Sequence, residues 1–135
     1  MEIKWIELES RGDKRGQLII AESQKNIPFE IKRVYCLYDM GSMPRGFHAH
    51  KELQQVMVCL TGNCSVMLDD GTEKHTILIN KDKPGILIDK FIWHEMSNFS
   101  QDCILMVLAS DYYDESDYIR NYNQFITEAE LNHDT

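Results

Sequence analysis

Two histidines, His48 and His50, stand two residues apart in the segment 44–51. Side chains alternate across a β-strand, so both imidazoles lie on one face if this segment is extended. Because free imidazole has a pKa of about 6.5, such a pair acts either as two metal ligands or as a proton-transfer pair. The alternative is a pair of histidines on a solvated face. The apolar run after Gln55 favours an interior setting, and we therefore interpret the pair as chemically active.

Arg33 and Tyr35 share a face in the same way within the strand-like segment 31–38. In an extended segment every second residue faces the same side, and we expect the side that carries Arg33 and Tyr35 to face the interior. A tyrosine there can hydrogen-bond a histidine or a ligand, and a planar guanidinium gives bidentate contacts to phosphate. Arg45 is a second candidate for binding an anion, and Lys51 is a weaker one. Each of these side chains could instead belong to the core or to the surface.

The charge balance narrows the choice of ligand. The 135 residues include 14 Lys and Arg against 22 Asp and Glu, a net charge of −8. Nucleic acid and anionic membranes require a basic face, so neither is expected as a partner. An anionic small molecule remains compatible if a few local arginines meet its charge. No signal peptide and no apolar run of about 18 residues is apparent, which makes the cytoplasm the expected location.

The elements that must position these residues are mostly strands. No internal repeat or linker interrupts the chain, so we expect one domain over 1–135. Four cysteines lie in apolar runs without a C-x-x-C pattern, which predicts buried thiols rather than zinc ligands or disulfides. Short apolar runs between turn signals predict strands, and without helices between them they indicate an antiparallel sandwich or barrel. These runs are 17–21, 31–38, 56–60, 65–68, 76–79, 86–88 and 103–108.

Three local features refine this picture. Asp70-Gly71 predicts a two-residue type I′ hairpin turn. Apolar residues at helical spacing from Tyr118 to Ala129 predict one C-terminal helix, for which Asp114 is a candidate cap. Runs such as 103–108 lack alternation, which predicts strands covered on both faces. A second subunit over the outer face near Val58 and Leu105 would provide that cover.

The histidine segment resembles the first motif of the cupins, which contains a Gly, a His-x-His pair, a Glu and a second Gly. The matching residues are Gly41, His48, His50, Gln55 and Gly62, and His94 with Asn98 match the second motif. The resemblance implies an all-β fold, a cupin jelly-roll or double-stranded β-helix barrel, with the C-terminal α-helix appended. Metal-dependent cupins use the Glu as a ligand, and the amide of Gln55 is a poor substitute. We therefore expect a pocket without metal or other cofactor.

The chain more closely resembles the dTDP-4-keto-6-deoxyglucose 3,4-ketoisomerases of deoxysugar biosynthesis. The stretches that carry this resemblance are 15–16, 26–29, 31–35, 44–51, 93–96, 109–115 and 117–120. The resemblance implies a dTDP-linked keto-sugar as substrate. It also implies a metal-free homodimer whose subunits exchange their N-terminal strands.

Moving a ketone from carbon 4 to carbon 3 needs a base, a group that serves both oxygens, and positive charge near the enediolate. We expect His48, His50 and Tyr35 to be catalytic, with His50 favoured as the base. The residues expected to bind substrate are Arg15, Arg33, Arg45, Lys51, Gln55, Trp93 and His94, although Trp93 could instead fill the core of the barrel. Arg15 and His94 together resemble family members that form the galacto product, so dTDP-3-keto-6-deoxygalactose is expected rather than the gluco epimer.

Other functions remain open on the same fold. A metal-dependent dioxygenase would need bound iron, and Gln55 argues against it. A sugar-binding cupin without enzymatic activity would bind ligand and exchange no sugar hydrogens. A 3,5-epimerase would also remove the proton on carbon 3, but no His–Asp dyad is evident in the sequence.

Overall fold

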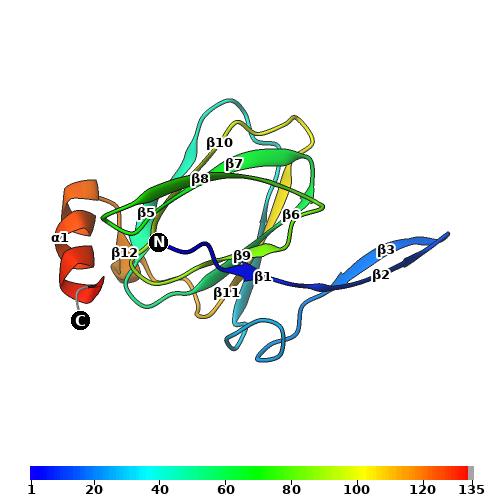
Figure 1. Cartoon of the computed structure of the whole chain (residues 1–135), viewed down its shortest axis with the longest axis horizontal. Helices are drawn as coiled ribbons and strands as arrows, with labels where there is room; N and C mark the ends of the chain where they lie inside the picture. The colour runs from blue at the N-terminus through cyan, green and yellow to red at the C-terminus, as the bar shows by residue number, and fades with distance from the viewer. Residues whose placement is uncertain (134–135) are drawn as a thin grey trace.

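The structure, a computed structural model, describes residues 1–133. Two five-stranded sheets form the body of the molecule, and every pairing between their strands is antiparallel (Figure 1). The first sheet has the order β1-β9-β6-β11-β4, with β1 at Trp5–Ile6, β9 at Gly85–Ile88, β6 at Gln55–Thr61, β11 at Ile104–Ala109 and β4 at Arg33–Leu37. The second has the order β12-β5-β10-β7-β8, with β12 at Tyr118–Ile119, β5 at Arg45–His50, β10 at Trp93–Ser97, β7 at Asn63–Asp69 and β8 at Lys74–Asn80.

The main core lies between the two sheets. Met57 and Leu105 from the first sheet and Val66 and Leu68 from the second belong to one buried cluster. Burial of this apolar surface is the dominant driving force for bringing the two sheets together. The arrangement confirms the predicted all-β cupin jelly roll with one C-terminal helix. No helix within residues 1–133 is long and apolar enough to cross a membrane.

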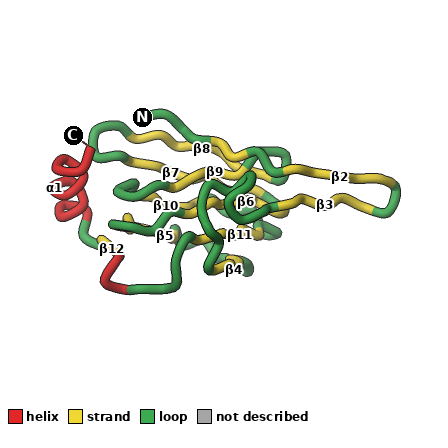
Figure 2. The backbone as a smooth tube through the Cα atoms, turned by 90° about the horizontal axis from the view of Figure 1, so that it is seen from below, coloured by secondary structure: helices red, strands yellow, loops and turns green. Residues whose placement is uncertain are grey.

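Two elements lie outside the sheets. A hairpin of β2 (Glu9–Asp13) and β3 (Gly16–Ile20) projects from one end of the barrel, and helix α1 (Tyr122–His133) covers the opposite end (Figures 1 and 2). The helix buries Phe125 and Ala129 against the second sheet. The hairpin has no comparable cover, and Leu18 and Ile19 are 52% and 44% exposed.

The outer face of the first sheet is covered by the chain itself over β6 and β11, whereas Val34 on β4 stays 54% exposed. Val56, Val58 and Leu108 pack against Ile27 and Phe29, which lie between the hairpin and β4. The prediction that these strands are buried on both faces was right. At Val58 the cover comes from the chain's own segment 27–29 rather than from the expected second subunit, and the dimer itself stays a prediction. Sequence periodicity reports that a face is covered and does not identify what covers it.

The β7–β8 connection also differs from the prediction. Asp69 pairs with Lys74, so the connection has four residues rather than two. The Asp70 carboxylate accepts hydrogen bonds from the backbone N–H groups of Thr72 and Glu73, both at 2.8 Å. These hydrogen bonds from the backbone to the Asp70 side chain stabilise a turn that is longer than the two-residue form that Asp-Gly favours.

The C-terminal helix begins later than predicted. Asp114 caps a single 3₁₀ turn, η1 (Glu115–Asp117), and Tyr118–Ile119 then forms β12. Strand β12 pairs with His50 and Ala49 of β5, and this tertiary pairing overrides the helical spacing of its two residues. Helix α1 starts only at Tyr122, with the Asn121 side chain accepting from the Gln124 N–H at 2.9 Å.

Candidate active site

A bulge in β5 positions the first histidine. Gly46 and Phe47 both have positive φ angles, +97° and +60°, and the register between β5 and β10 shifts beside them. A Cβ atom at Gly46 would lie 2.7 Å from the backbone oxygen of His94, so only glycine allows the two strands to approach this closely. The bulge sets His48 directly opposite His94 in the register.

A cavity of about 400 Å³ opens beside these two histidines. Five of its lining residues were predicted from sequence, namely Arg33, Tyr35, Arg45, His48 and His94. The cavity is also lined by Leu37, Gly46, Met57, Met96, Tyr118 and Arg120. Its wall thus combines imidazoles, phenols and guanidinium groups with an apolar floor, the usual composition of a small-molecule site.

The three histidine rings form one cluster. The ring centroid of His48 is 4.5 Å from that of His94 and 5.0 Å from that of His50. The Nδ1 atoms of His48 and His94 lie 3.0 and 3.2 Å from the backbone oxygens of Gly46 and Ile92. A carbonyl only accepts, so Nδ1 carries the hydrogen in both rings and Nε2 keeps its lone pair.

Burial makes all three imidazoles neutral at neutral pH. It is the main cause that lowers the pKa of His48, and it lowers the pKa of His94 well below the usual range. Burial is the main cause that lowers the pKa of His50 to about 3, and the neighbouring His48, Arg33 and Arg120 lower it further because they disfavour a second positive charge. A neutral imidazole with a free Nε2 can accept a proton, so the cluster is suited to general-base chemistry.

Tyr35 is held by Gln55 at the cavity wall. The Nε2 of Gln55 donates to the Tyr35 hydroxyl oxygen over 2.7 Å, and Gln55 is only 2% exposed. Because that hydrogen bond uses the oxygen as acceptor, the hydroxyl hydrogen is left for another partner. Burial raises the pKa of Tyr35, as does nearby Tyr118, so the phenol keeps its proton.

Three arginines border the cavity of this acidic chain. The Arg33 guanidinium lies 5.1 Å from the centroid of the Tyr35 ring, and its buried Nε has no hydrogen-bond partner among the described residues. The Arg120 guanidinium lies 4.3 Å from the centroid of the Tyr118 ring and pairs with Glu115. Together with Arg45 they concentrate positive charge where an anionic ligand would enter.

Five predicted site residues do not line this cavity, and one of them, Gln55, meets it only through its hydrogen bond to Tyr35. Trp93 is 3% exposed and packs on α1, because alternation along β10 turns it away from His94. Arg15 lies in the projecting hairpin and pairs with Asp13. Lys51 follows the end of β5 and does not line the cavity. His50 lines a smaller neighbouring cavity of about 130 Å³ instead.

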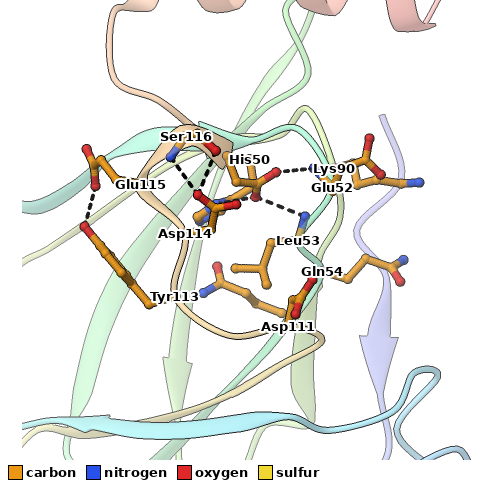
Figure 3. A network of polar contacts seen from close by, with 12 residues as sticks. His50, Glu52, Leu53, Gln54, Lys90, Asp111, Tyr113, Asp114, Glu115 and Ser116 are labelled. Carbon is orange, nitrogen blue, oxygen red and sulfur yellow. Dashed lines mark hydrogen bonds and ion pairs between the residues drawn. The ribbon is translucent and has the colours of Figure 1, made fainter.

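The sequence reasoning missed Tyr118, Arg120 and Asp117. Tyr118 and Arg120 were assigned to a helix, and their i, i+2 spacing on an extended segment is the signal that could have placed them together. Asp117 lies 3.2 Å from Nδ1 of His50, and Figure 3 shows His50 beside the segment that carries Asp114 and Ser116. The expectation that no His–Asp dyad exists was therefore wrong.

The residues at the cupin metal position do not fit a metal ion. Gln55 turns its amide nitrogen, which is no metal ligand, toward Tyr35. The rings of His50 and His94 stack at 25° with centroids 6.2 Å apart. Within residues 1–133, no group of three or more His, Cys, Asp or Glu side chains is arranged to hold a metal.

Comparison with known proteins identifies the family. The chain matches the family described as FdtA, WxcM-like, C-terminal, over residues 1–130. It is 54% identical over 126 residues to the TDP-4-oxo-6-deoxy-alpha-D-glucose-3,4-oxoisomerase of Aneurinibacillus thermoaerophilus, covering 93% of this chain and 91% of the relative.

Solved structures agree with this match. A 3,4-ketoisomerase from Helicobacter canadensis has a TM-score of 0.90 and 45% identity, covering 96% of this chain and 98% of that chain. QdtA from Thermoanaerobacterium thermosaccharolyticum, a histidine-to-asparagine variant in complex with TDP-4-keto-6-deoxyglucose, has a TM-score of 0.92 and 41% identity, covering 96% and 94%. On sequence and on structure alike, the chain belongs to the FdtA, or WxcM-like C-terminal, family of sugar isomerases.

Proposed function

We propose that this chain is a TDP-4-keto-6-deoxyglucose 3,4-ketoisomerase. TDP-sugar 3,4-ketoisomerase activity is supported by the 54% identity to a relative that carries this name and by the ketoisomerases among the solved structures. The observation that best supports the proposal is the position and protonation state of His48. This residue is a neutral imidazole on the cavity wall whose Nδ1 hydrogen is committed to Gly46 and whose Nε2 is free to accept a proton.

His48 is the proposed base for the proton on carbon 3. Its Nε2 takes that proton to form an enediol, and the resulting imidazolium returns a proton to carbon 4. His50 was favoured from sequence, but it is 2% exposed and lies outside the lining of the 400 Å³ cavity. A base must reach the hydrogen it removes, and this requirement favours His48.

Tyr35 is the proposed partner of the sugar oxygens. During the reaction the oxygen on carbon 4 gains a hydrogen and the oxygen on carbon 3 loses one. The Tyr35 hydroxyl can serve both, because Gln55 occupies its oxygen as a donor and leaves its hydrogen for the substrate. Arg33, Arg45 and Arg120 are the proposed ligands of the diphosphate, which guanidinium groups bind bidentately.

We further propose a dimer that exchanges its N-terminal hairpins. The exposed Leu18 and Ile19 and the 90% exposed side chain of Arg15 support a role for β2–β3 outside its own barrel. Such an exchange would carry Arg15 toward the partner's cavity. With His94 on the cavity wall, Arg15 would then contact the sugar, and we propose the galacto product, dTDP-3-keto-6-deoxygalactose.

NMR time courses of the purified protein with TDP-4-keto-6-deoxyglucose test these proposals, in ordinary water for the couplings of the product and in deuterated water for hydrogen exchange. We expect a 3-keto product, and a small coupling between the hydrogens on carbons 4 and 5 identifies the galacto form. A large diaxial coupling would assign the gluco form. Hydrogen exchange at carbons 3 and 5 without ketone migration would indicate an epimerase. Binding with no exchange at all would indicate a sugar-binding protein and overturn the enzymatic proposal.

A further inference from the structure

The carboxylate of Asp117 is the hub of a hydrogen-bond network behind the histidine cluster. Its Oδ2 lies 3.2 Å from Nδ1 of His50 and also accepts from the Leu53 N–H at 3.2 Å. Its Oδ1 accepts from the Glu52 N–H at 2.8 Å. A carboxylate that accepts from two backbone N–H groups has no hydrogen to donate, so the hydrogen between Asp117 and His50 belongs to the imidazole.

This arrangement dictates the tautomer of His50. With the hydrogen on Nδ1, Nε2 holds a lone pair, and that atom is buried without a hydrogen-bond partner among the described residues. The His50 ring meets the edge of His48 with centroids 5.0 Å apart, at an interplanar angle of 82°. His48 lines the cavity and His50 does not, so His50 can influence the sugar only through its neighbours.

We propose that Asp117 is a positioning residue for the isomerisation, which rests on the ketoisomerase function proposed above. By accepting from Nδ1, Asp117 locks the His50 ring in one orientation and one tautomer. The dipole of a neutral imidazole reverses direction when its hydrogen moves to the other nitrogen. The tautomer of His50 therefore sets the electrostatic potential at His48, which becomes positively charged when it takes the proton from the sugar.

The network explains why Asp117 is suited to this role and its neighbours are not. Figure 3 shows His50 enclosed by the 3₁₀ turn and by the segment that begins at Glu52. Asp114 caps the same turn, but its carboxylate accepts from the N–H and hydroxyl of Ser116, and the hydrogen-bond partner of the His50 ring is Asp117. The backbone oxygen of Asp117 also accepts from the N–H of Lys51, the residue directly after β5, at 3.0 Å.

The test is Asp117→Asn, with Asp114→Asn as the matched control. An asparagine has one acceptor oxygen, which the N–H groups of Glu52 and Leu53 would claim. Its NH₂ group would then face Nδ1 of His50 and force the ring hydrogen onto Nε2. We expect kcat for TDP-4-keto-6-deoxyglucose to fall about tenfold to a hundredfold with KM nearly unchanged. Asp114→Asn should keep wild-type kinetics because asparagine is also a good cap.

Two further readouts separate positioning from a merely structural role. In long-range ¹H–¹⁵N spectra of protein labelled at histidine, His50 should be protonated at Nδ1 in the wild type and at Nε2 in Asp117→Asn. In a double-mutant cycle, His50→Asn combined with Asp117→Asn should be no slower than His50→Asn alone, because Asp117 acts through that ring.

The proposal is overturned if wild-type His50 carries its hydrogen on Nε2, a result that does not depend on how any variant folds. It is equally overturned if Asp117→Asn retains full kcat, or if the losses in the double variant multiply. A wild-type enzyme without ketoisomerase activity would instead count against the proposed function, so the two failures are distinguishable.

Discussion

Replacing Gln55 with glutamate should convert the Tyr35 hydroxyl from a partner of the substrate into a partner of the protein. Gln55 is 2% exposed and donates to the Tyr35 oxygen over 2.7 Å. A protonated glutamate can donate in the same way. An ionised glutamate can only accept, so it would draw the hydroxyl hydrogen of Tyr35 away from the sugar.

The magnitude follows from the burial of this position. Burial disfavours the charged carboxylate and raises its pKa by up to about 3–5 units, and positive Arg33 beside Tyr35 opposes part of that rise. Allowing a net rise of about 2–3 from the reference pKa of about 4.3, we expect the introduced glutamate to ionise between roughly pH 6.3 and 7.3. Above that pH, kcat should be about a hundredfold below that of the wild type, the cost of losing a positioned acid.

The stability of the variant should follow the same ionisation. The introduced carboxyl has a higher pKa in the folded than in the unfolded state. Its ionisation therefore costs no stability below the unfolded pKa of about 4.3, where both states are protonated. As the pH rises from the unfolded to the folded pKa, the free energy of unfolding should fall by about 1.4 kcal/mol per pH unit. Denaturant unfolding at several pH values measures this slope.

The kinetic assay is kcat for Gln55→Glu and wild type across pH 5–8, followed by NMR. Gln101→Glu controls for the added charge, since Gln101 is exposed. We expect the variant to approach wild-type activity at low pH and to diverge as pH rises. A variant whose kcat runs parallel to the wild type at every pH would refute the reasoning, as would an equal pH response in a background of Tyr35→Phe.

Four further expectations follow from the structure. His48→Asn should slow turnover by about a hundredfold or more with little change in KM, and a variant with normal kcat would exclude His48 as the base. Because burial lowers the pKa of His48 below its ordinary 6.5 and the base acts in its neutral form, kcat should decline only below about pH 6.5; an acidic limb centred above that value would contradict the assignment. Activity should survive exhaustive chelation, and an enzyme silenced by chelator and restored by iron would argue for metal dependence. Sedimentation should give a dimeric mass at micromolar concentration, reduced by Leu18→Glu in the hairpin, whereas a monomeric mass for the wild type would rule out the exchanged dimer.

Local periodicity determined which side chains share a face. The i, i+2 spacing of His48 with His50 and of Arg33 with Tyr35 holds in the structure, because alternation is a property of any extended backbone. The apolar runs likewise predicted most strands and the all-β class, because the apolar side chains of each run must be buried wherever the strand lies in the sheet. The acidic balance, and the need for a few arginines to meet an anionic ligand, also follow from the amino-acid sequence alone.

Tertiary structure alone decided which of these residues meet the substrate cavity. Asp117 reaches His50 across 67 residues of sequence, and Tyr118 joins the cavity because β12 pairs with β5 rather than continuing into the helix. Strand alternation assigned Trp93 to the core only once the register of β10 was known. Such pairings are contacts between distant segments, and their energies depend on partners that no local window of sequence contains.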